Sequence, residues 1–239
     1  ETSRLRRENL SLKRKDNTNA EMIGNSGAFK TLVGQLDKVT KSNGRVMLTG
    51  PAGAGKEVAA RYIHSNSNRA HAPFITVNCA GVAPDRMEEV LFGRETPEGG
   101  VVYFDEVADM PLGTQSKILR VLVDQQFMRV GGNDKVRVDL RVISSTNKDL
   151  AAEIQADTFR EELYHRLNVV PIAVPSLSER REDIPLLAAH FIAEFNATQG
   201  LPLREISDDA QALMQTMVWP GNVRQLKNLV ERVLILGEG

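Results

Sequence analysis

The chain has 239 residues, of which 41% are hydrophobic and 26% charged, which suits one large globular domain or a domain with a small helical appendage. Its formal net charge of −1 excludes a polyanion-binding surface spread over the whole chain, so nucleic-acid contact would need a local patch or a further domain. No apolar run approaches the roughly 18 residues of a membrane span, and the single cysteine, Cys79, excludes an internal disulfide and a cysteine-based zinc cluster, so we expect a cytoplasmic protein.

The first twenty residues are polar and mix basic with acidic side chains. Leu5 and Leu12 lie seven positions apart, the spacing of a coiled-coil seam, but a solvated or frayed linker helix gives the same pattern. The segment has no apolar block of the kind found in a signal peptide. Because the chain starts at Glu1, we interpret residues 1–20 as a linker helix in a fragment of a longer protein.

Residues 21–175 alternate short apolar strands with helices. Such alternation is typical of a parallel sheet with helices on both faces, so the predicted fold class is α/β. The expected strands are 45–49, 73–78, 101–104, 136–146 and 169–174, and the expected helices are 57–65 and 116–125.

After Pro175 the pattern is helical throughout. Apolar residues recur at helical spacing between Ile184 and Phe195. Ser207 is placed to cap a second helix with acidic residues in its first turn, and a last helix follows the break at Pro220. These features predict a small all-α lid subdomain at 176–239, with Trp219 as an anchor of its core.

Residues Gly50–Lys56 match the phosphate-binding pattern G-x-x-x-x-G-K. The glycines let the backbone aim its N–H groups at phosphate oxygens, the following helix presents its positive end, and Lys56 adds a full charge. Glu57 stands where the general motif has a Ser or Thr that holds Mg²⁺. A chance glycine loop is the alternative, and the strand before the motif and the helix after it argue against this. The predicted nucleotide-binding residues here are Pro51, Ala52, Gly53, Ala54, Gly55, Lys56, Glu57 and Val58.

An apolar strand ends in two acids, Asp105 and Glu106, the Walker B pattern. Asp105 can hold Mg²⁺ at the carboxyl end of the strand. Glu106 can orient and deprotonate an attacking water. An acidic loop after a strand is the alternative, and the upstream phosphate loop makes the catalytic interpretation stronger.

Six further strings occur in order: PFITVNCAG, FDEVADMP, STNKDL, FREELYHRLNVVPI, LSERREDI and WPGNVRQLKN. From about residue 21 onward the chain resembles the central AAA+ ATPase domain of bacterial enhancer-binding proteins, the activators of sigma-54 RNA polymerase. The strings APDRMEEVLFG and LPLREISDDA are most similar to response regulators of nitrogen regulation within that family. The resemblance implies a P-loop NTPase fold that binds ATP or ADP with Mg²⁺.

The resemblance also implies roles for polar residues around the phosphates. In this family a Glu follows the phosphate-loop Lys, so Glu57 agrees with the resemblance. Asn78 corresponds to a switch residue that hydrogen-bonds Glu106. Asn147 corresponds to a sensor near the γ-phosphate. Taken alone, Asn78 would be an ordinary residue at a strand end.

Further residues correspond to parts that surround the nucleotide. Arg160 and Arg166 match the two arginine-finger candidates offered to a neighbouring subunit, although surface ion pairs with nearby acids are the alternative. Arg224 matches the lid arginine that senses phosphate. Ile23 and Gly24 match the segment that contacts adenine. A site completed by a neighbour implies a ring, usually a hexamer, with a dimer as an inactive form.

The chain departs from the family between the LFG motif and the Walker B strand. Family members carry there a GAFTGA loop that contacts sigma-54, whereas here Gly93 is followed by only five residues, to Glu98, before Gly99. Either the protein lacks the loop, or the Glu98–Gly99 junction is artificial. Five residues reach under about 20 Å, too short for a crossover helix, which favours the second explanation. Contact with sigma-54 stays open.

Two functional interpretations follow. The first is the ATP-hydrolysing central domain of a two-component response regulator, which assembles as a ring to remodel RNA polymerase holoenzyme. The alternative is a nucleotide-binding oligomerisation module that does not contact sigma-54 and hydrolyses ATP weakly or not at all. Both expect an absent receiver domain that a sensor kinase phosphorylates and an absent helix-turn-helix domain that binds DNA. A small-molecule kinase conflicts with the sensor and finger motifs.

Overall fold

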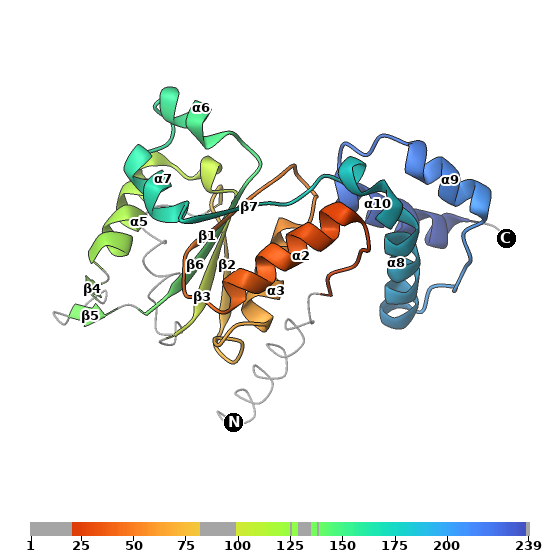
Figure 1. Cartoon of the computed structure of the whole chain (residues 1–239), viewed down its shortest axis with the longest axis horizontal. Helices are drawn as coiled ribbons and strands as arrows, with labels where there is room; N and C mark the ends of the chain where they lie inside the picture. The colour runs from red at the N-terminus through yellow and green to blue at the C-terminus, as the bar shows by residue number, and fades with distance from the viewer. Residues whose placement is uncertain (1–20, 82–98, 125, 129–134, 138, 238–239) are drawn as a thin grey trace.

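The computed structural model describes residues 21–237 except 82–98, 125, 129–134 and 138 (Figure 1). The expected linker helix at 1–20 and the segment in which a GAFTGA loop is expected both lie outside the described residues. Among the helices that the structure describes, none combines the length and apolar character needed to cross a membrane.

A parallel sheet forms the centre of the larger lobe (Figure 1). Its five strands lie in the order β2-β3-β6-β1-β7, and all four neighbouring pairs are parallel. This confirms the predicted α/β class. The strands are β1 Val46–Thr49, β2 Phe74–Asn78, β3 Val101–Asp105, β6 Arg141–Thr146 and β7 Val170–Ala173.

The prediction of a single strand at 136–146 is wrong. The structure has two strands there: β5 (Lys135–Arg137) pairs antiparallel with β4 (Gln126–Met128), and β6 joins the parallel sheet. The β-branched residues continue through both strands, so composition alone does not reveal where the chain leaves one sheet for the other.

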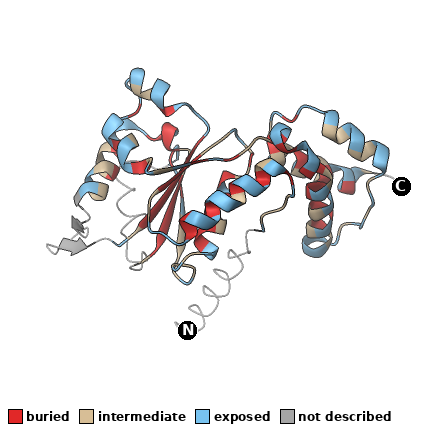
Figure 2. Ribbon diagram, viewed as in Figure 1, coloured by how far each residue is buried: buried red, intermediate tan, exposed pale blue. Residues whose placement is uncertain are grey.

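Helices cover both faces of the sheet, and side chains alternate between them along each strand. In β3, Val101 and Tyr103 face a core shared with α2 (Gly27–Thr40) and α3 (Lys56–Ser65). Val102 and Phe104 face the opposite core, under α5 (Leu112–Asp124) and α7 (Glu161–Leu167). The central strands β1, β3 and β6 are buried on both faces, as Figure 2 shows, whereas the edge strands β2 and β7 are partly exposed. A short helix, α6 (Leu150–Gln155), precedes α7.

The helix α2 is not among the expected elements, although its apolar residues recur at helical spacing and its first turn has a clear capping signal. Ser26 precedes the helix, and its hydroxyl accepts a hydrogen bond from the backbone N–H of Phe29 at 3.2 Å. The inward face of α2 is apolar and includes Leu32 and Leu36, which are almost fully buried.

The region after β7 is helical, as predicted. It contains η2 (Leu177–Asp183), α8 (Ile184–Gln199), α9 (Asp208–Thr216) and α10 (Asn222–Leu236). Ser207 caps α9 by accepting from Ala210 N at 3.3 Å. Trp219 is 5% exposed in the core of this region and donates its indole N–H to the Met214 carbonyl, which confirms its predicted anchoring role. α9 itself buries no residue fully.

A buried carboxylate ties the start of the described chain to the helical region. Asp183 accepts from Asn25 N at 2.6 Å, from Ser26 N at 2.8 Å and from Ser26 Oγ at 2.7 Å. It also pairs with Arg180, whose Nε lies 2.9 Å from Asp183 Oδ2. The two charged residues are 1% and 5% exposed. The guanidinium lies over the Phe29 ring, 4.4 Å from its centre.

Replacing Asp183 with Ala should destabilise the fold strongly, because it leaves Arg180 buried without its charge partner. We expect a loss of about 3–5 kcal/mol in the free energy of unfolding, measured by urea denaturation. Glu182→Ala removes an exposed acid next to it and should change the free energy by less than about 0.5 kcal/mol. Equal losses in both variants would contradict the role of the pair.

The same carboxylate should make stability depend on pH. Burial raises the pKa of Asp183, but the hydrogen bonds from Asn25 and Ser26 and the charge of Arg180 outweigh it, so the pKa is lowered overall. A lowered folded-state pKa stabilises the protein above the unfolded-state value of 3.8, and this stabilisation disappears as pH falls below it. Between pH 6 and pH 3 the free energy of unfolding should therefore change less with pH in Asp183→Asn than in the wild type, as measured by urea denaturation at each pH.

Candidate nucleotide-binding site

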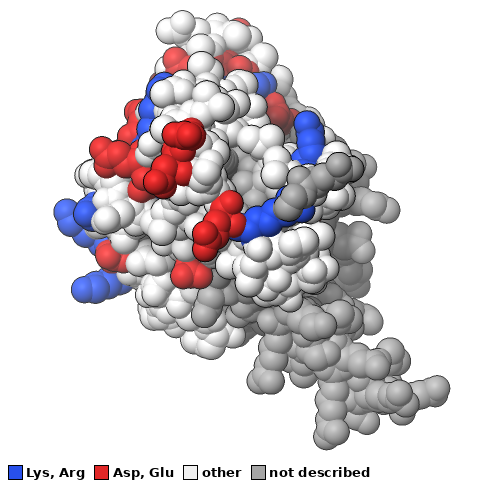
Figure 3. Space-filling model, turned by 90° about the vertical axis from the view of Figure 1, so that its right-hand side faces the viewer, with Lys and Arg blue, Asp and Glu red and all other residues white. Residues whose placement is uncertain are grey.

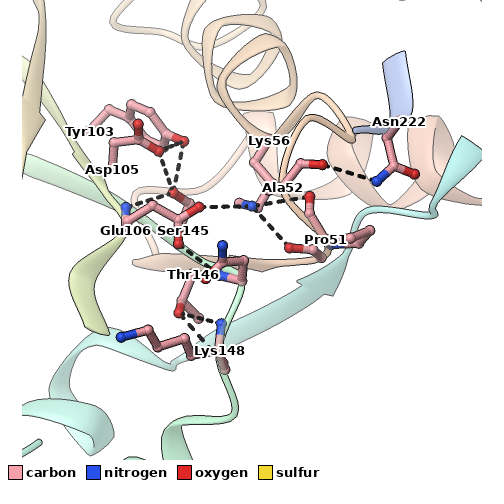
Figure 4. A network of polar contacts seen from close by, with 12 residues as sticks. Pro51, Ala52, Lys56, Tyr103, Asp105, Glu106, Ser145, Thr146, Lys148 and Asn222 are labelled. Carbon is pink, nitrogen blue, oxygen red and sulfur yellow. Dashed lines mark hydrogen bonds and ion pairs between the residues drawn. The ribbon is translucent and has the colours of Figure 1, made fainter. Parts of the chain in front are cut away.

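The carboxyl ends of β1, β3 and β6 meet at one edge of the sheet, because these strands are parallel and β6 pairs with both of the others. The loop after β1 is fixed to the end of β6 by a hydrogen bond from Gly50 N to Thr146 O at 3.3 Å. The phosphate loop, the two acids and the segment after β6 therefore surround one place (Figure 4).

The phosphate loop needs glycine at two positions for different reasons. Gly55 directly precedes α3 with φ 108°, a left-handed conformation that residues with a Cβ rarely adopt. Gly53 has φ 76°, and a Cβ there would lie 2.2 Å from the carbonyl oxygen of Gly221. The loop and the helical region thus touch through their backbones.

Lys56 is the central cation of the site and is 6% exposed. Its ammonium donates to the carbonyls of Gly50 and Pro51 at 2.9 and 3.3 Å. It also forms an ion pair with Glu106 Oε1 at 3.0 Å (Figure 4). In this arrangement the lysine charge is satisfied entirely by the chain's own oxygens.

The two acids after β3 have separate environments. Glu106 has a left-handed backbone, with φ 55°, and its Oε2 accepts from Asn147 N at 2.8 Å. Asp105 Oδ1 receives the hydroxyl groups of Tyr103 and Ser145 at 3.0 and 2.9 Å. Asp105 Oδ2 has no hydrogen bond or ion pair with the described residues, so a carboxylate oxygen suited to Mg²⁺ is available beside the phosphate loop.

Neither asparagine side chain forms a hydrogen bond with Glu106 within the described residues. Asn147 reaches Glu106 through its main-chain N–H, not through its exposed side chain. Asn78 lies opposite Asp105 in the register of β2 with β3, but its side-chain oxygen accepts from Ala80 N at 3.1 Å. Within the described residues, no hydrogen bond joins Asn78 to Glu106, so the switch contact stays a prediction.

Glu57 and Val58, in the first turn of α3, point away from the acids. Both are exposed. The carboxylate of Glu57 pairs with Arg61, one turn later, at 2.9 Å. The structure therefore brings Lys56 to the acids and leaves these two residues at the rim.

The helical region contacts the phosphate loop at the start of α10. Arg224 donates its backbone N–H to Gly53 O at 3.2 Å, while its side chain is exposed. Asn222 is 4% exposed, and its amide donates to Ala52 O at 3.0 Å and accepts from Leu177 N at 2.8 Å. The sequence analysis does not predict Asn222 as a site residue, although it lies in the quoted string WPGNVRQLKN. In the structure its backbone is left-handed, with φ 49°.

The expected adenine segment lies beside the buried ion pair described above. Arg180 donates to the carbonyl of Ile23. A Cβ on Gly24 would lie 2.5 Å from Arg180 Nη2 and 2.6 Å from the Phe29 ring, so the position has room only for glycine. Ile23 also packs against the core of the helical region. The segment thus spans the sheet and the lid.

Arg160 directly precedes α7 and Arg166 lies in its last turn, and both are exposed. Neither forms an ion pair with Glu161 or Glu162 among the described residues, and Glu161 lies 3.6 Å from His165 instead. No contact within the described chain joins either guanidinium to the phosphate loop or the two acids.

A second residue missed from the sequence, Gln115, holds the backbone of Arg160. Its amide is fully buried and donates to the carbonyls of Met110 and Thr158 at 2.8 and 2.9 Å. Its oxygen accepts from Arg160 N at 2.9 Å. Because Met110 follows the short turn after Glu106, this one side chain links the acid-bearing turn to the start of α7.

Comparisons with known proteins agree with this geometry. Residues 22–173 match the family model described as "Sigma-54 interaction domain", and residues 178–239 match "AAA+ ATPase lid domain". The nitrogen assimilation regulatory protein NtrX of Azorhizobium caulinodans is 49% identical over 252 residues, covering 100% of this chain and 55% of that protein. The transcriptional regulator NtrC of Klebsiella pneumoniae is 38% identical, covering 92% of this chain and 50% of that protein.

Crystal structures of NtrX from Brucella abortus show the same fold. The complex with ADP has a TM-score of 0.87 and the complex with ATP 0.86, each at 50% identity, with 100% of this chain and 57% of that chain covered. The chain spans about half the length of the curated relatives that it matches.

The first family match covers 152 residues, from 22 to 173, which is more than half of the chain, and the second covers the helical region. The chain therefore belongs to the sigma-54 interaction domain family of AAA+ ATPases.

Proposed function

We propose that this chain binds ATP with Mg²⁺ and hydrolyses it, and that hydrolysis drives remodelling of sigma-54 RNA polymerase. The observation that carries the proposal is the meeting of Lys56, Asp105 and Glu106 at one sheet edge, with Lys56 only 3.0 Å from Glu106. The NtrX of Brucella abortus, at 50% identity over the whole chain, has been crystallised with ATP and with ADP, which supports nucleotide binding here. The family match favours this function over a module that does not hydrolyse ATP.

Each side chain has a definite task in the proposed reaction. The backbone N–H groups of residues 52–58 and the Lys56 ammonium bind the phosphates. Asp105 would hold Mg²⁺ through Oδ2, and the bound cation would supply positive charge beside the phosphate oxygens. Glu106 orients and deprotonates the attacking water, with Asn147 beside it. Ile23, Gly24, Asn78 and Arg224 border the nucleotide in the roles that the family implies.

The Lys56–Glu106 ion pair suggests how nucleotide entry prepares the base. A γ-phosphate carries more negative charge than one carboxylate, so it competes with Glu106 for the Lys56 ammonium. Among the described residues, release from Lys56 leaves the Glu106 carboxylate hydrogen-bonded to Asn147 N alone, with its other oxygen free to accept a proton from water.

We also propose that the site is completed by a second copy of the chain. Arg160 and Arg166 are exposed and unpaired with the neighbouring acids, as arginines offered to another subunit would be. A head-to-tail interface of this kind closes into a ring, which we take to be a hexamer, with a dimer as the inactive form.

The remaining parts of the proposal concern the longer protein. Residues 1–20 would form a linker from a receiver domain, 21–175 the nucleotide-binding subdomain and 176–239 the lid. DNA binding belongs to a further helix-turn-helix domain and signalling to a sensor kinase. Figure 3 views the end of the molecule formed by the lid and shows acidic and basic side chains interspersed on that face.

Glu106→Gln and Lys56→Ala should have different effects on binding and turnover. Glu106→Gln should lower ATP turnover about 10²- to 10⁴-fold and retain ATP binding, because it removes only the base. Lys56→Ala should weaken ATP binding about 10- to 100-fold, because a charged donor to phosphate is lost. Steady-state turnover and equilibrium binding of a fluorescent ATP analogue measure the two quantities, with Glu205→Gln, an exposed lid carboxylate, as control. Wild-type turnover in Glu106→Gln would show that Glu106 is not the base.

A mixing experiment tests whether the arginines act between subunits. Arg160→Ala and Arg166→Ala should each lower turnover about 10³-fold without changing ATP affinity, whereas Arg232→Ala, an exposed lid arginine, should have no effect. Mixing Arg160→Ala subunits with Glu106→Gln subunits should restore activity, because intact acids then meet intact arginines at about a quarter of the interfaces. Failure of every mixture to regain turnover would rule out a shared site.

A further inference from the structure

Two buried hydroxyl groups contact the acids of the site, and the proposed reaction gives them no direct part. Along β3, residues 101, 103 and 105 share one face of the sheet, so the Tyr103 hydroxyl reaches forward to Asp105. Along β6, residues 143 and 145 share that same face, and Ile143 lies opposite Tyr103 in the register. Ser145 thus projects beside Asp105 from the neighbouring strand (Figure 4).

The Ser145 hydroxyl is the centre of this group, and its hydrogen-bonding capacity is completely used. Its oxygen lies 2.8 Å from Tyr103 Oη and 3.2 Å from Glu106 N, and 2.9 Å from Asp105 Oδ1. A serine hydroxyl has one proton and two acceptor positions. Accepting from Tyr103 and from Glu106 N while donating to Asp105 Oδ1 fills all three.

The Tyr103 hydroxyl is the second donor of this group. Its side chain is fully buried. The hydroxyl oxygen lies 2.8 Å from Ser145 Oγ and 3.0 Å from Asp105 Oδ1, so its one proton goes either to Ser145 or directly to Asp105. In both arrangements Asp105 Oδ1 accepts a hydroxyl proton.

Both acids are oriented by this arrangement. With Oδ1 bound to hydroxyl groups, only Oδ2 of Asp105 remains for a cation. Glu106 adopts a left-handed backbone, which persists only where the surrounding structure holds it, and its N–H donates to Ser145 Oγ. We propose that Ser145 and Tyr103 are positioning residues that aim Asp105 at Mg²⁺ and fix the peptide of Glu106.

This inference rests on the proposed role of Asp105 as the Mg²⁺ ligand, and it predicts a graded effect. Removing a group that orients a metal ligand typically costs 10- to 100-fold in metal affinity or activity. Ser145→Ala removes three hydrogen bonds at once. It should therefore raise by about 10- to 100-fold the Mg²⁺ concentration at which the effect of Mg²⁺ on ADP affinity is half-maximal. Tyr103→Phe leaves the Ser145–Asp105 bond in place and should have an effect of about 3- to 10-fold.

The adjacent serine provides a matched control. Ser144 is equally buried but points to the opposite face of the sheet, and its hydroxyl has no hydrogen-bond partner in the part of the chain that the structure describes. Ser144→Ala makes the same one-atom change in the same strand. It should leave the Mg²⁺ dependence within about twofold of the wild type, because no oriented group is lost.

The experiment measures ADP affinity in the full-length protein by calorimetry, once in EDTA and once across a Mg²⁺ titration. For Ser145→Ala and Tyr103→Phe, affinity in EDTA should match the wild type, while the Mg²⁺ titration shifts to higher concentration. This readout needs no hydrolysis, so it stays decisive even if the chain proves inactive as an ATPase. Turnover should show a lowered kcat in Ser145→Ala with an unchanged KM for ATP at saturating Mg²⁺.

Three results would overturn the proposal. The first is a wild-type Mg²⁺ titration in both variants, and the second is an equal shift in Ser144→Ala. The third is an affinity loss in EDTA as large as the loss in Mg²⁺, which would indicate general disruption of the site. Tyr103→Phe keeps the buried ring in place, so it decides the question if Ser145→Ala fails to fold.

Discussion

The parallel alignment of β1, β3 and β6 is the constraint on which the site depends. Because strands in a parallel sheet start at one edge and end at the other, the groups that follow each strand converge. The phosphate loop follows β1, the acids follow β3, and Asn147 follows β6. Lys56 can then reach back from α3 to Glu106 across 3.0 Å, even though fifty residues separate them in sequence.

Buried polar groups, more than apolar contacts, decide how the lid sits on the sheet. Asp183 binds two backbone amides and a hydroxyl from the segment before α2. Asn222 joins the phosphate loop to the first residue of η2. Such groups are costly to bury unless every bond is made, so they allow one docking geometry and penalise neighbouring ones. Asp183 thus holds the residues that directly follow the expected adenine segment, and Asn222 holds the phosphate loop.

Sequence reasoning succeeded where the determinant was local. The glycines around Lys56, the acids that end an apolar strand and the Ser207 cap all depend on residues a few positions apart, and the fold class follows from alternating elements. It failed where the determinant was a distant partner. The contact of Asp183 with Asn25 spans 158 positions, and that of Gln115 with Arg160 spans 45. The break between β5 and β6 was missed because β-branched residues fill both strands.

The backbone contact between the phosphate loop and the lid has a thermodynamic consequence. The carbonyls of Ala52 and Gly53 face the lid, where Asn222 and the amide of Arg224 bind them. In a planar trans peptide the N–H points opposite to the C=O, so the N–H groups of these two peptide units, from Gly53 and Ala54, point away from the lid. Ala54 N donates to Pro51 O at 3.2 Å within the loop, which leaves Gly53 N–H for a phosphate. A phosphate bound by Gly53 N–H and a docked lid therefore stabilise the same peptide orientation. Lid docking and phosphate binding must therefore strengthen each other by an equal factor, so the position of the lid reports whether the loop holds a phosphate.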